Sequence, residues 1–208
     1  MSEFDRYQRT DSIDENKPGD RVVARRVELM VKLIKGRVNY LAMLVLTALN
    51  AILYLAGTGF ELPFYLALPY YLLILGRGAV GDPSKTAVLI LCFAGALLLF
   101  GLSVALFFLL KKGGAWYGVA KVYIIADSIF VVLLGVFIYV TQKNFNAIFV
   151  LLLNLAYHIF VFCYLVSASR ADYALTVLPE SEDAVEDDIS LLTENSDSDT
   201  QTEDDPEN

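Results

Sequence analysis

The chain has 208 residues, of which 56% are hydrophobic and only 19% are charged, and its mean hydropathy is positive. This composition excludes an ordinary soluble domain and is typical of a membrane protein. The net charge of −8 belongs mostly to one end, because fourteen of the 24 acidic residues follow Arg170 and no Lys or Arg does. We expect no nucleic-acid partner.

The N-terminal part combines a polar stretch, residues 1–20, with a basic stretch, residues 21–37. We expect the first to be disordered, and because it contains no short apolar run, we predict no cleavable signal peptide. The second has the helical period of a basic amphipathic helix. Its cations suit the anionic lipid of a cytoplasmic membrane face, as a topology anchor or as a specific lipid or partner site. They are Arg21, Arg25, Arg26, Lys32, Lys35 and Arg37.

Four later stretches are long and apolar enough to cross a hydrocarbon core of about 30 Å. They cover about residues 38–56, 86–110, 116–140 and 146–168. The basic residues before the first span, between the second and third, and after the fourth would lie on one side. The positive-inside rule makes that side cytoplasmic, with both termini inside.

The connection between the first two spans is also apolar, over residues 62–75. It is too short for a crossing and contains Pro63 and Pro69. We expect a helix that lies at the outer interface or enters the membrane as a re-entrant segment, against the alternative of a plain apolar cap over the bundle.

Polar residues on three different spans fall at one predicted depth. Counted from the cytoplasmic ends of their helices, Asp127, His158 and Asn50 all lie roughly 16–20 Å deep. Asn154 is one turn from His158, and Tyr123 is one turn from Asp127. These five residues are candidates for a proton relay or a ligand site, because ionisable groups inside a span are rare and usually functional. The alternative is hydrogen bonding that only holds the helices together.

Enzyme chemistry has little support in the sequence. No hydrolase, phosphate-loop or dinucleotide motif is present, and one histidine with two separated cysteines does not make an ordinary zinc site. We therefore expect no catalytic residue, no metal and no cofactor. An intramembrane enzyme would have to use Asp127 and His158 as acid and base.

The C-terminal stretch, residues 180–208, is acidic and poor in apolar residues, so we expect a disordered cytoplasmic tail. Within it, Asp187, Leu191 and Leu192 fit an acidic dileucine sorting pattern. A plain solvated tail is the alternative.

Several short features resemble a group of uncharacterised four-span membrane proteins of Gram-positive bacteria. They are Pro69-Tyr70-Tyr71-Leu72 with Gly76, Lys111-Lys112-Gly113-Gly114 before Trp116, Asp127, His158, and Leu178-Pro179. The resemblance runs from the first span to Pro179 and implies a bacterial cell membrane. It implies no reaction, because no activity is established for that group.

Together these features predict an all-α polytopic membrane protein, an antiparallel four-helix bundle over residues 38–179 with an added interfacial or re-entrant segment. The leading hypothesis is a small protein of binding, regulatory or transport-accessory type that either self-associates or binds another membrane protein. A trafficking or scaffold protein acting through its tail is the alternative, and an intramembrane enzyme is the second.

Overall fold

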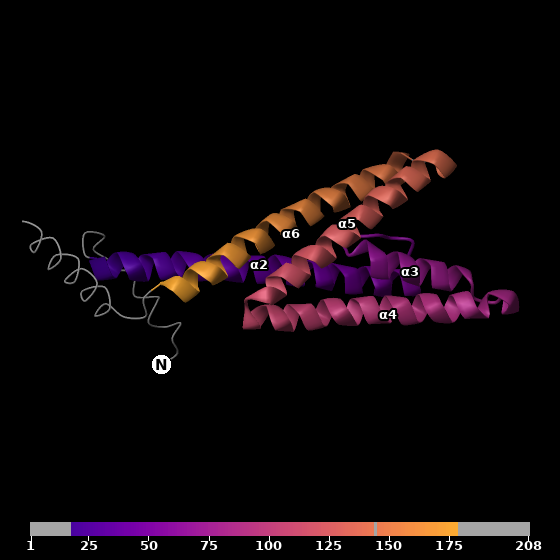
Figure 1. Ribbon diagram of the computed structural model, residues 1–208. Helices are drawn as coiled ribbons and strands as arrows, with labels where there is room; N and C mark the ends of the chain where they lie inside the picture. Colours follow the sequence, from indigo (N-terminus) through magenta and orange to yellow (C-terminus); the bar gives the residue numbers. More distant parts are fainter. Residues whose placement is uncertain (1–17, 144, 179–208) are drawn as a thin grey trace, which may run out of the picture. The chain divides into compact units, whose positions relative to one another are not determined.

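The computed structural model describes residues 18–143 and 145–178, and all of its regular structure there is helical (Figure 1). The helices are α2 (Pro18–Leu55), α3 (Ala67–Gly78), α4 (Thr86–Leu109), α5 (Ala115–Gln142) and α6 (Phe145–Val177), with short 3₁₀ turns η1 (Pro83–Lys85) and η2 (Leu110–Lys112). Four helical stretches, residues 21–55, 83–112, 115–141 and 145–177, are long and apolar enough to cross a membrane. The predicted four-helix membrane bundle is confirmed.

The chain divides into two compact units. Residues 32–173 form the larger unit and contain every site discussed below. The other unit combines residues 1–31 with residues 174–208, and its described parts are the ends of α2 and α6. The expectations for residues 1–17 and for the tail, including Asp187, Leu191 and Leu192, lie outside the described residues.

The first span and the basic stretch before it form one continuous helix. α2 runs from Pro18 to Leu55 without a break near residue 37, so the amphipathic segment is its first part. At the other end of the chain, α6 also continues beyond the predicted end of the fourth span, as far as Val177. Both helices are therefore longer than the roughly twenty residues that a crossing requires.

Helices α2 and α6 approach closely at two small residues. A Cβ atom built on Gly36 would lie 2.6 Å from Cβ of Ala168 and 3.1 Å from the backbone oxygen of Tyr164. Small residues allow such close backbone contact between membrane helices, where dispersion forces must replace the hydrophobic effect. Gly36 is therefore required by the packing of this crossing.

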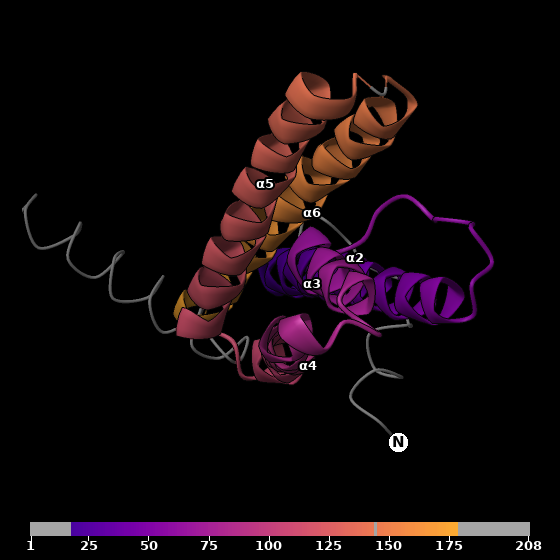
Figure 2. The same ribbon diagram turned by 90° about the vertical axis from the view of Figure 1, so that its right-hand side faces the viewer.

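Helix α3 is the added segment, and it packs against α4 and α5 (Figure 2). Tyr65 and Tyr70 form a buried cluster with Val131 of α5 and Leu151 of α6. The helix has twelve residues, too few to cross a bilayer, and it begins shortly before Pro69. Proline is tolerated there because the first N–H groups of a helix have no partner inside it.

The turn before α4 is capped by Asp82. Its carboxylate accepts hydrogen bonds from the backbone N–H of Ser84 at 3.0 Å and from the hydroxyl of the same residue at 2.6 Å. The Ser84 hydrogen bonds and the nearby Lys85 ammonium, 3.0 Å away, lower the pKa of the Asp82 carboxyl. This cap fixes the start of the second span.

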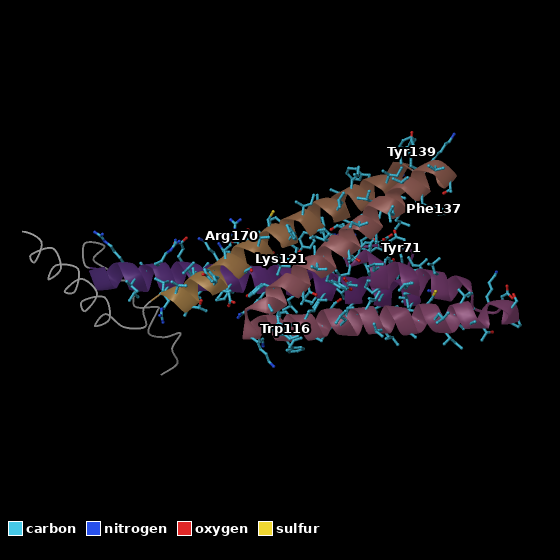
Figure 3. The ribbon with its side chains drawn as sticks, in the orientation of Figure 1. Tyr71, Trp116, Lys121, Phe137, Tyr139 and Arg170 are labelled. Atoms are coloured by element: carbon cyan, nitrogen blue, oxygen red, sulfur yellow. The ribbon has the colours of Figure 1, made fainter. Side chains whose placement is uncertain are left out.

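Aromatic and basic residues mark the two ends of α5 (Figure 3). Trp116 and Lys121 lie toward its first end, and Phe137 and Tyr139 lie toward the turn into α6. Lys143 forms that turn in the left-handed conformation, with φ 51°, and its N–H bonds to the oxygen of Ile138 at 3.1 Å. Aromatic side chains at helix ends suit the headgroup boundary of a bilayer.

Candidate functional site

Asp127 lies near the middle of α5, and its carboxylate caps the first turn of α3. Oδ2 accepts the backbone N–H of Ala67 at 2.8 Å, and Oδ1 accepts that of Leu68 at 2.7 Å. The side chain is fully buried. The first N–H groups of a helix lack partners within the helix and carry partial positive charge. A carboxylate both accepts their hydrogen bonds and carries the opposite charge. The start of α3 is thus held at mid-height of α5, which favours a re-entrant segment over an interfacial one.

His158 on α6 is the second partner of the same carboxylate. Its Nδ1 lies 2.8 Å from the backbone oxygen of Asn154, and because a carbonyl only accepts, Nδ1 carries a hydrogen. Its Nε2 lies 2.6 Å from Oδ2 of Asp127. Two acceptors would repel at this distance, so a proton lies between these atoms. The ring therefore connects the backbone of α6 to the Asp127 carboxylate of α5.

Two further buried side chains bind the chain just before α3. Oδ1 of Asn154 accepts the N–H of Tyr65 at 2.9 Å. The hydroxyl of Thr47 on α2 accepts the N–H of Leu66 at 2.8 Å and donates to the oxygen of Met43 at 2.7 Å. Among the described residues, Nδ2 of Asn154 is the buried side-chain atom that lacks a hydrogen-bond partner.

Asn50 holds the beginning of the same segment by two hydrogen bonds. Its Nδ2 donates to the oxygen of Leu62 at 2.7 Å, and its Oδ1 accepts the N–H of Leu62 at 2.7 Å. Asn50 is fully buried. A planar amide that pairs with both groups of one residue fixes its position and orientation.

The contacts of these side chains converge on one stretch of backbone, residues 62–68. Five of its N–H groups bond to buried side chains from α2, α5 and α6; they belong to Leu62, Tyr65, Leu66, Ala67 and Leu68. Irregular backbone at membrane depth needs such partners, because lipid supplies none. The stretch also contains Phe64 with φ 75°, a conformation that a non-glycine residue keeps only where its surroundings fix it.

Tyr123 is the candidate whose hydroxyl bonds neither to this segment nor to another candidate residue. Its hydroxyl donates to the backbone oxygen of Leu99 on α4 at 3.3 Å. Tyr40 makes a similar bond to the oxygen of Ser103, also at 3.3 Å. These tyrosines connect α5 and α2 to α4, away from the bonds that hold residues 62–68.

Thr47 also belongs to the site, although it is not among the residues predicted from the sequence. A threonine in an apolar span is unremarkable because its hydroxyl can bond to the turn before it, as Thr47 does to Met43. The available signal was its spacing, since Thr47 lies three residues before Asn50 and thus on the same helix face.

The candidate lipid-binding cations have protein partners where the structure gives their contacts. Arg25 forms an ion pair with Glu28 at 2.5 Å, and both side chains are about half exposed. Arg37 Nε donates to the hydroxyl of Tyr117 on α5 at 3.2 Å. Arg21, Arg26 and Lys32 also have interaction partners, and Lys35 is exposed.

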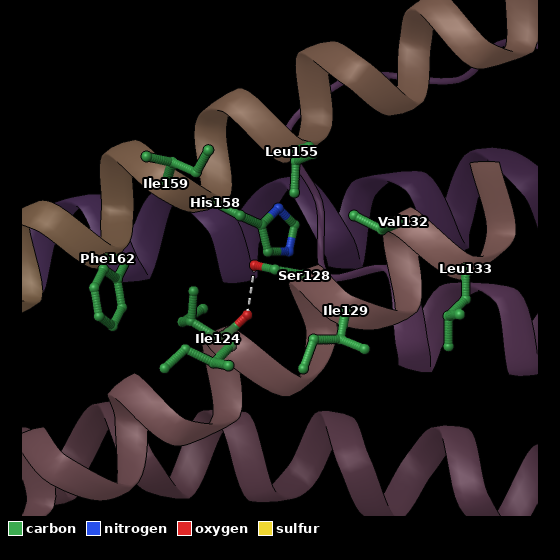
Figure 4. A pocket seen from close by; sticks show the side chains of 10 residues that line it. Ile124, Ser128, Ile129, Val132, Leu133, Leu155, His158, Ile159 and Phe162 are labelled. Carbon is green, nitrogen blue, oxygen red and sulfur yellow. Dashed lines mark hydrogen bonds between the residues drawn. The ribbon is translucent and has the colours of Figure 1, made fainter. Parts of the chain in front are cut away.

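A groove lies between α5 and α6 beside this site (Figure 4). It has a volume of about 350 Å³ and is lined mainly by isoleucine, leucine and valine. Ser128 and His158 supply its polar atoms, and the Ser128 hydroxyl donates to the oxygen of Ile124 at 2.7 Å. The His158 ring thus lies between the Asp127 carboxylate and an apolar surface groove.

The fold and its surface define an integral, multi-pass membrane protein. Large apolar side chains are exposed along all four long helices; for example, Leu91 and Leu97 on α4 are each 72% exposed. No protein-family model, curated protein or solved structure matches the chain. Within residues 18–143 and 145–178, no group of three His, Cys, Asp or Glu residues could hold a metal ion.

Proposed function

We propose that this chain is a small regulatory binding protein of the membrane in which the Asp127–His158 pair holds the re-entrant helix α3. The observation that supports this function is the double role of Oδ2 of Asp127. It accepts the N–H of Ala67 at 2.8 Å and lies 2.6 Å from Nε2 of His158. Any event that changes the pair therefore changes the cap of α3.

Because one carboxylate oxygen makes both contacts, the position of the His158 ring and the cap of α3 are coupled. The arrangement in which Nε2 of His158 contacts Oδ2 of Asp127 is the one that holds α3. A ligand that displaces the ring would therefore disturb the acceptor of the first N–H groups of α3.

The contacts of the pair support this role over conduction or catalysis. Both carboxylate oxygens of Asp127 and both ring nitrogens of His158 have protein partners within the described part of the chain. A proton carrier or catalytic acid needs an atom that can exchange with water or substrate. A residue pair that holds α3 in place instead needs all of its polar atoms to be bonded to the protein, as they are here.

The proposal is tested by the mobility of α3 in reconstituted protein. A spin label is attached at Leu75→Cys, an α3 position that is 59% exposed, in a chain with Cys92→Ala and Cys163→Ala. Asp127→Asn should increase the mobility of this label. The matched control is Asp172→Asn, because Asp172 also accepts a backbone N–H, that of Gly114 at 2.6 Å, away from α3.

Two results would contradict the holding role. One is an equal effect of Asp127→Asn and Asp172→Asn on the Leu75 label, and the other is no effect of either. Deletion of residues 180–208 tests the competing trafficking function. It should leave the mobility of the Leu75 label unchanged. It should alter the cellular location of the protein only if the tail carries the function.

The orientation that we propose puts the turn at Lys111 and Lys112 on the cytoplasmic side and Lys143 on the other, as the positive-inside rule predicts. Single cysteines at Lys112 and Lys143 test it in intact cells. A membrane-impermeant maleimide should label the cysteine at position 143 and not the one at 112. The opposite pattern would reverse the orientation.

A further inference from the structure

The groove between α5 and α6 continues from the polar site toward the turn that joins the two helices. A second cavity of about 300 Å³ shares Val132 and Leu155 with the first. Together they extend along α5 from Ile124 to Tyr139, which at 1.5 Å per residue is about 22 Å. The surface therefore has one long apolar channel on one side of the helix pair.

Gly135 contributes to the width of this channel. It lies within α5 and lines the second cavity, and a Cβ atom built on it would meet only Leu151 Cδ1, at 4.0 Å. Glycine in a helix is destabilising by up to about 1 kcal/mol relative to alanine. The small size of Gly135 therefore leaves space in the cavity and is not required by a close contact between helices.

The ends of the channel differ in chemistry. Its deep end, near the middle of α5, contains Ser128 and His158. Its other end reaches Tyr139, which is 57% exposed, close to the exposed Lys143 in the α5–α6 turn. A tyrosine and a lysine at the end of a span are typical of the headgroup level.

We propose that this channel binds one acyl chain of an anionic phospholipid, with the phosphate at Tyr139 and Lys143 and the chain end beside His158. The channel lies on the exposed surface of two helices that can cross a membrane, so it faces lipid. The channel is longer than the roughly 15 Å of hydrocarbon in one leaflet, so an acyl chain fits along it. The exposed Lys143, four residues after Tyr139, supplies a positive charge that complements a phosphate at this level. The buried His158 ring lines the deep end of this channel. A lipid there would lie beside the pair that holds α3, so this inference rests on the proposed function and extends it to a ligand class.

Fluorescence quenching by brominated lipid tests the binding. In a chain with Trp116→Phe, a new tryptophan is introduced as Val136→Trp in the channel, where Val136 is 57% exposed, or as Phe137→Trp outside it. The two positions are matched, since Phe137 is 58% exposed, lies on the same helix and lines neither cavity. The protein is reconstituted in phosphatidylcholine vesicles with a minor fraction of dibrominated phosphatidylglycerol or dibrominated phosphatidylcholine.

The tryptophan at position 136 should be quenched preferentially by brominated phosphatidylglycerol. Its relative affinity should be about fivefold higher than for brominated phosphatidylcholine, which corresponds to the contribution of one lysine near the membrane surface. The tryptophan at position 137 should show no preference. Lys143→Gln should remove the preference at position 136, and Gly135→Leu, which fills the channel, should reduce quenching by both lipids at that position.

Equal quenching at both positions by both lipids would overturn the proposal. So would a channel occupied by a second copy of the chain, which disulfide formation between copies carrying Val132→Cys would reveal. Because these readings do not depend on α3, they separate failure of the lipid site from failure of the holding role of Asp127.

Discussion

Oδ2 of Asp127 and Nε2 of His158 lie 2.6 Å apart, and the same oxygen accepts the backbone N–H of Ala67, the first residue of α3. One atom thus joins α5, α6 and α3. Buried ion pairs are not stabilising in general, because desolvation offsets their attraction. Here the carboxylate also satisfies two backbone groups that would have no other partner in lipid.

The first prediction concerns the coupling within this pair. Asp127→Asn should destabilise the protein by about 2 kcal/mol, since three buried hydrogen bonds average about 0.6 kcal/mol each in membrane proteins. His158→Gln should cost less, because it leaves both bonds to α3. The double mutant should show a coupling energy of at least about 1 kcal/mol, measured by SDS-induced unfolding in mixed micelles. Additive single effects would show that the two residues act separately.

The second prediction concerns the amide of Asn50. Asn50→Asp retains an acceptor for the N–H of Leu62 but places an oxygen against its carbonyl, where Nδ2 now donates. We expect Asn50→Asp to destabilise at least as much as Asn50→Ala, by about 1–2 kcal/mol in the same assay. A milder effect of the aspartate would mean that only the acceptor half of this contact matters.

The third prediction isolates the hydroxyl of Thr47. Thr47→Val keeps the shape of the side chain and removes the acceptor for Leu66 N–H, while Thr47→Ser keeps the acceptor. Amide hydrogen exchange across residues 62–68 should accelerate in the valine variant by about fivefold, equivalent to about 1 kcal/mol, and change little in the serine variant. Equal acceleration in both would point to packing of the methyl group.

The fourth prediction concerns the crossing of α2 and α6. Gly36→Ala should destabilise by about 1–3 kcal/mol, because the added methyl group would lie 2.6 Å from Cβ of Ala168. Ala168→Gly in the same chain should recover part of the loss. No recovery would locate the clash at the backbone oxygen of Tyr164, 3.1 Å away.

The helices could be predicted from the sequence because length and hydropathy alone determine which segments can cross lipid. Helical spacing also predicted one depth for Asp127, His158, Asn50 and Asn154, and all four are buried. Their contacts did not, since the partner of three of them is the backbone of residues 62–68, and backbone groups are the same in every residue. No period or motif marks which N–H groups lack a helical partner.

The outlying candidates show a second limit. Tyr123 is one turn from Asp127, yet its hydroxyl bonds to the backbone oxygen of Leu99 on α4 and not to residues 62–68. A long side chain can bond about one turn away from its own Cα, so equal depth along the chain does not mean equal depth of the polar atom. The contact of Thr47 with Leu66 was not predicted, because the short threonine hydroxyl can bond within its own helix, as it also does to Met43.

The contacts of residues 62–68 also determine when this part of the chain can reach its final place. The segment is synthesised after α2 but before α5 and α6, which carry Asp127 and Asn154. The N–H groups of Ala67 and Leu68 lack their acceptor until α5 is present, and the N–H of Tyr65 lacks its acceptor until α6 is present. Lipid offers no substitute. The segment can therefore reach its final position only after both of these later helices have been synthesised.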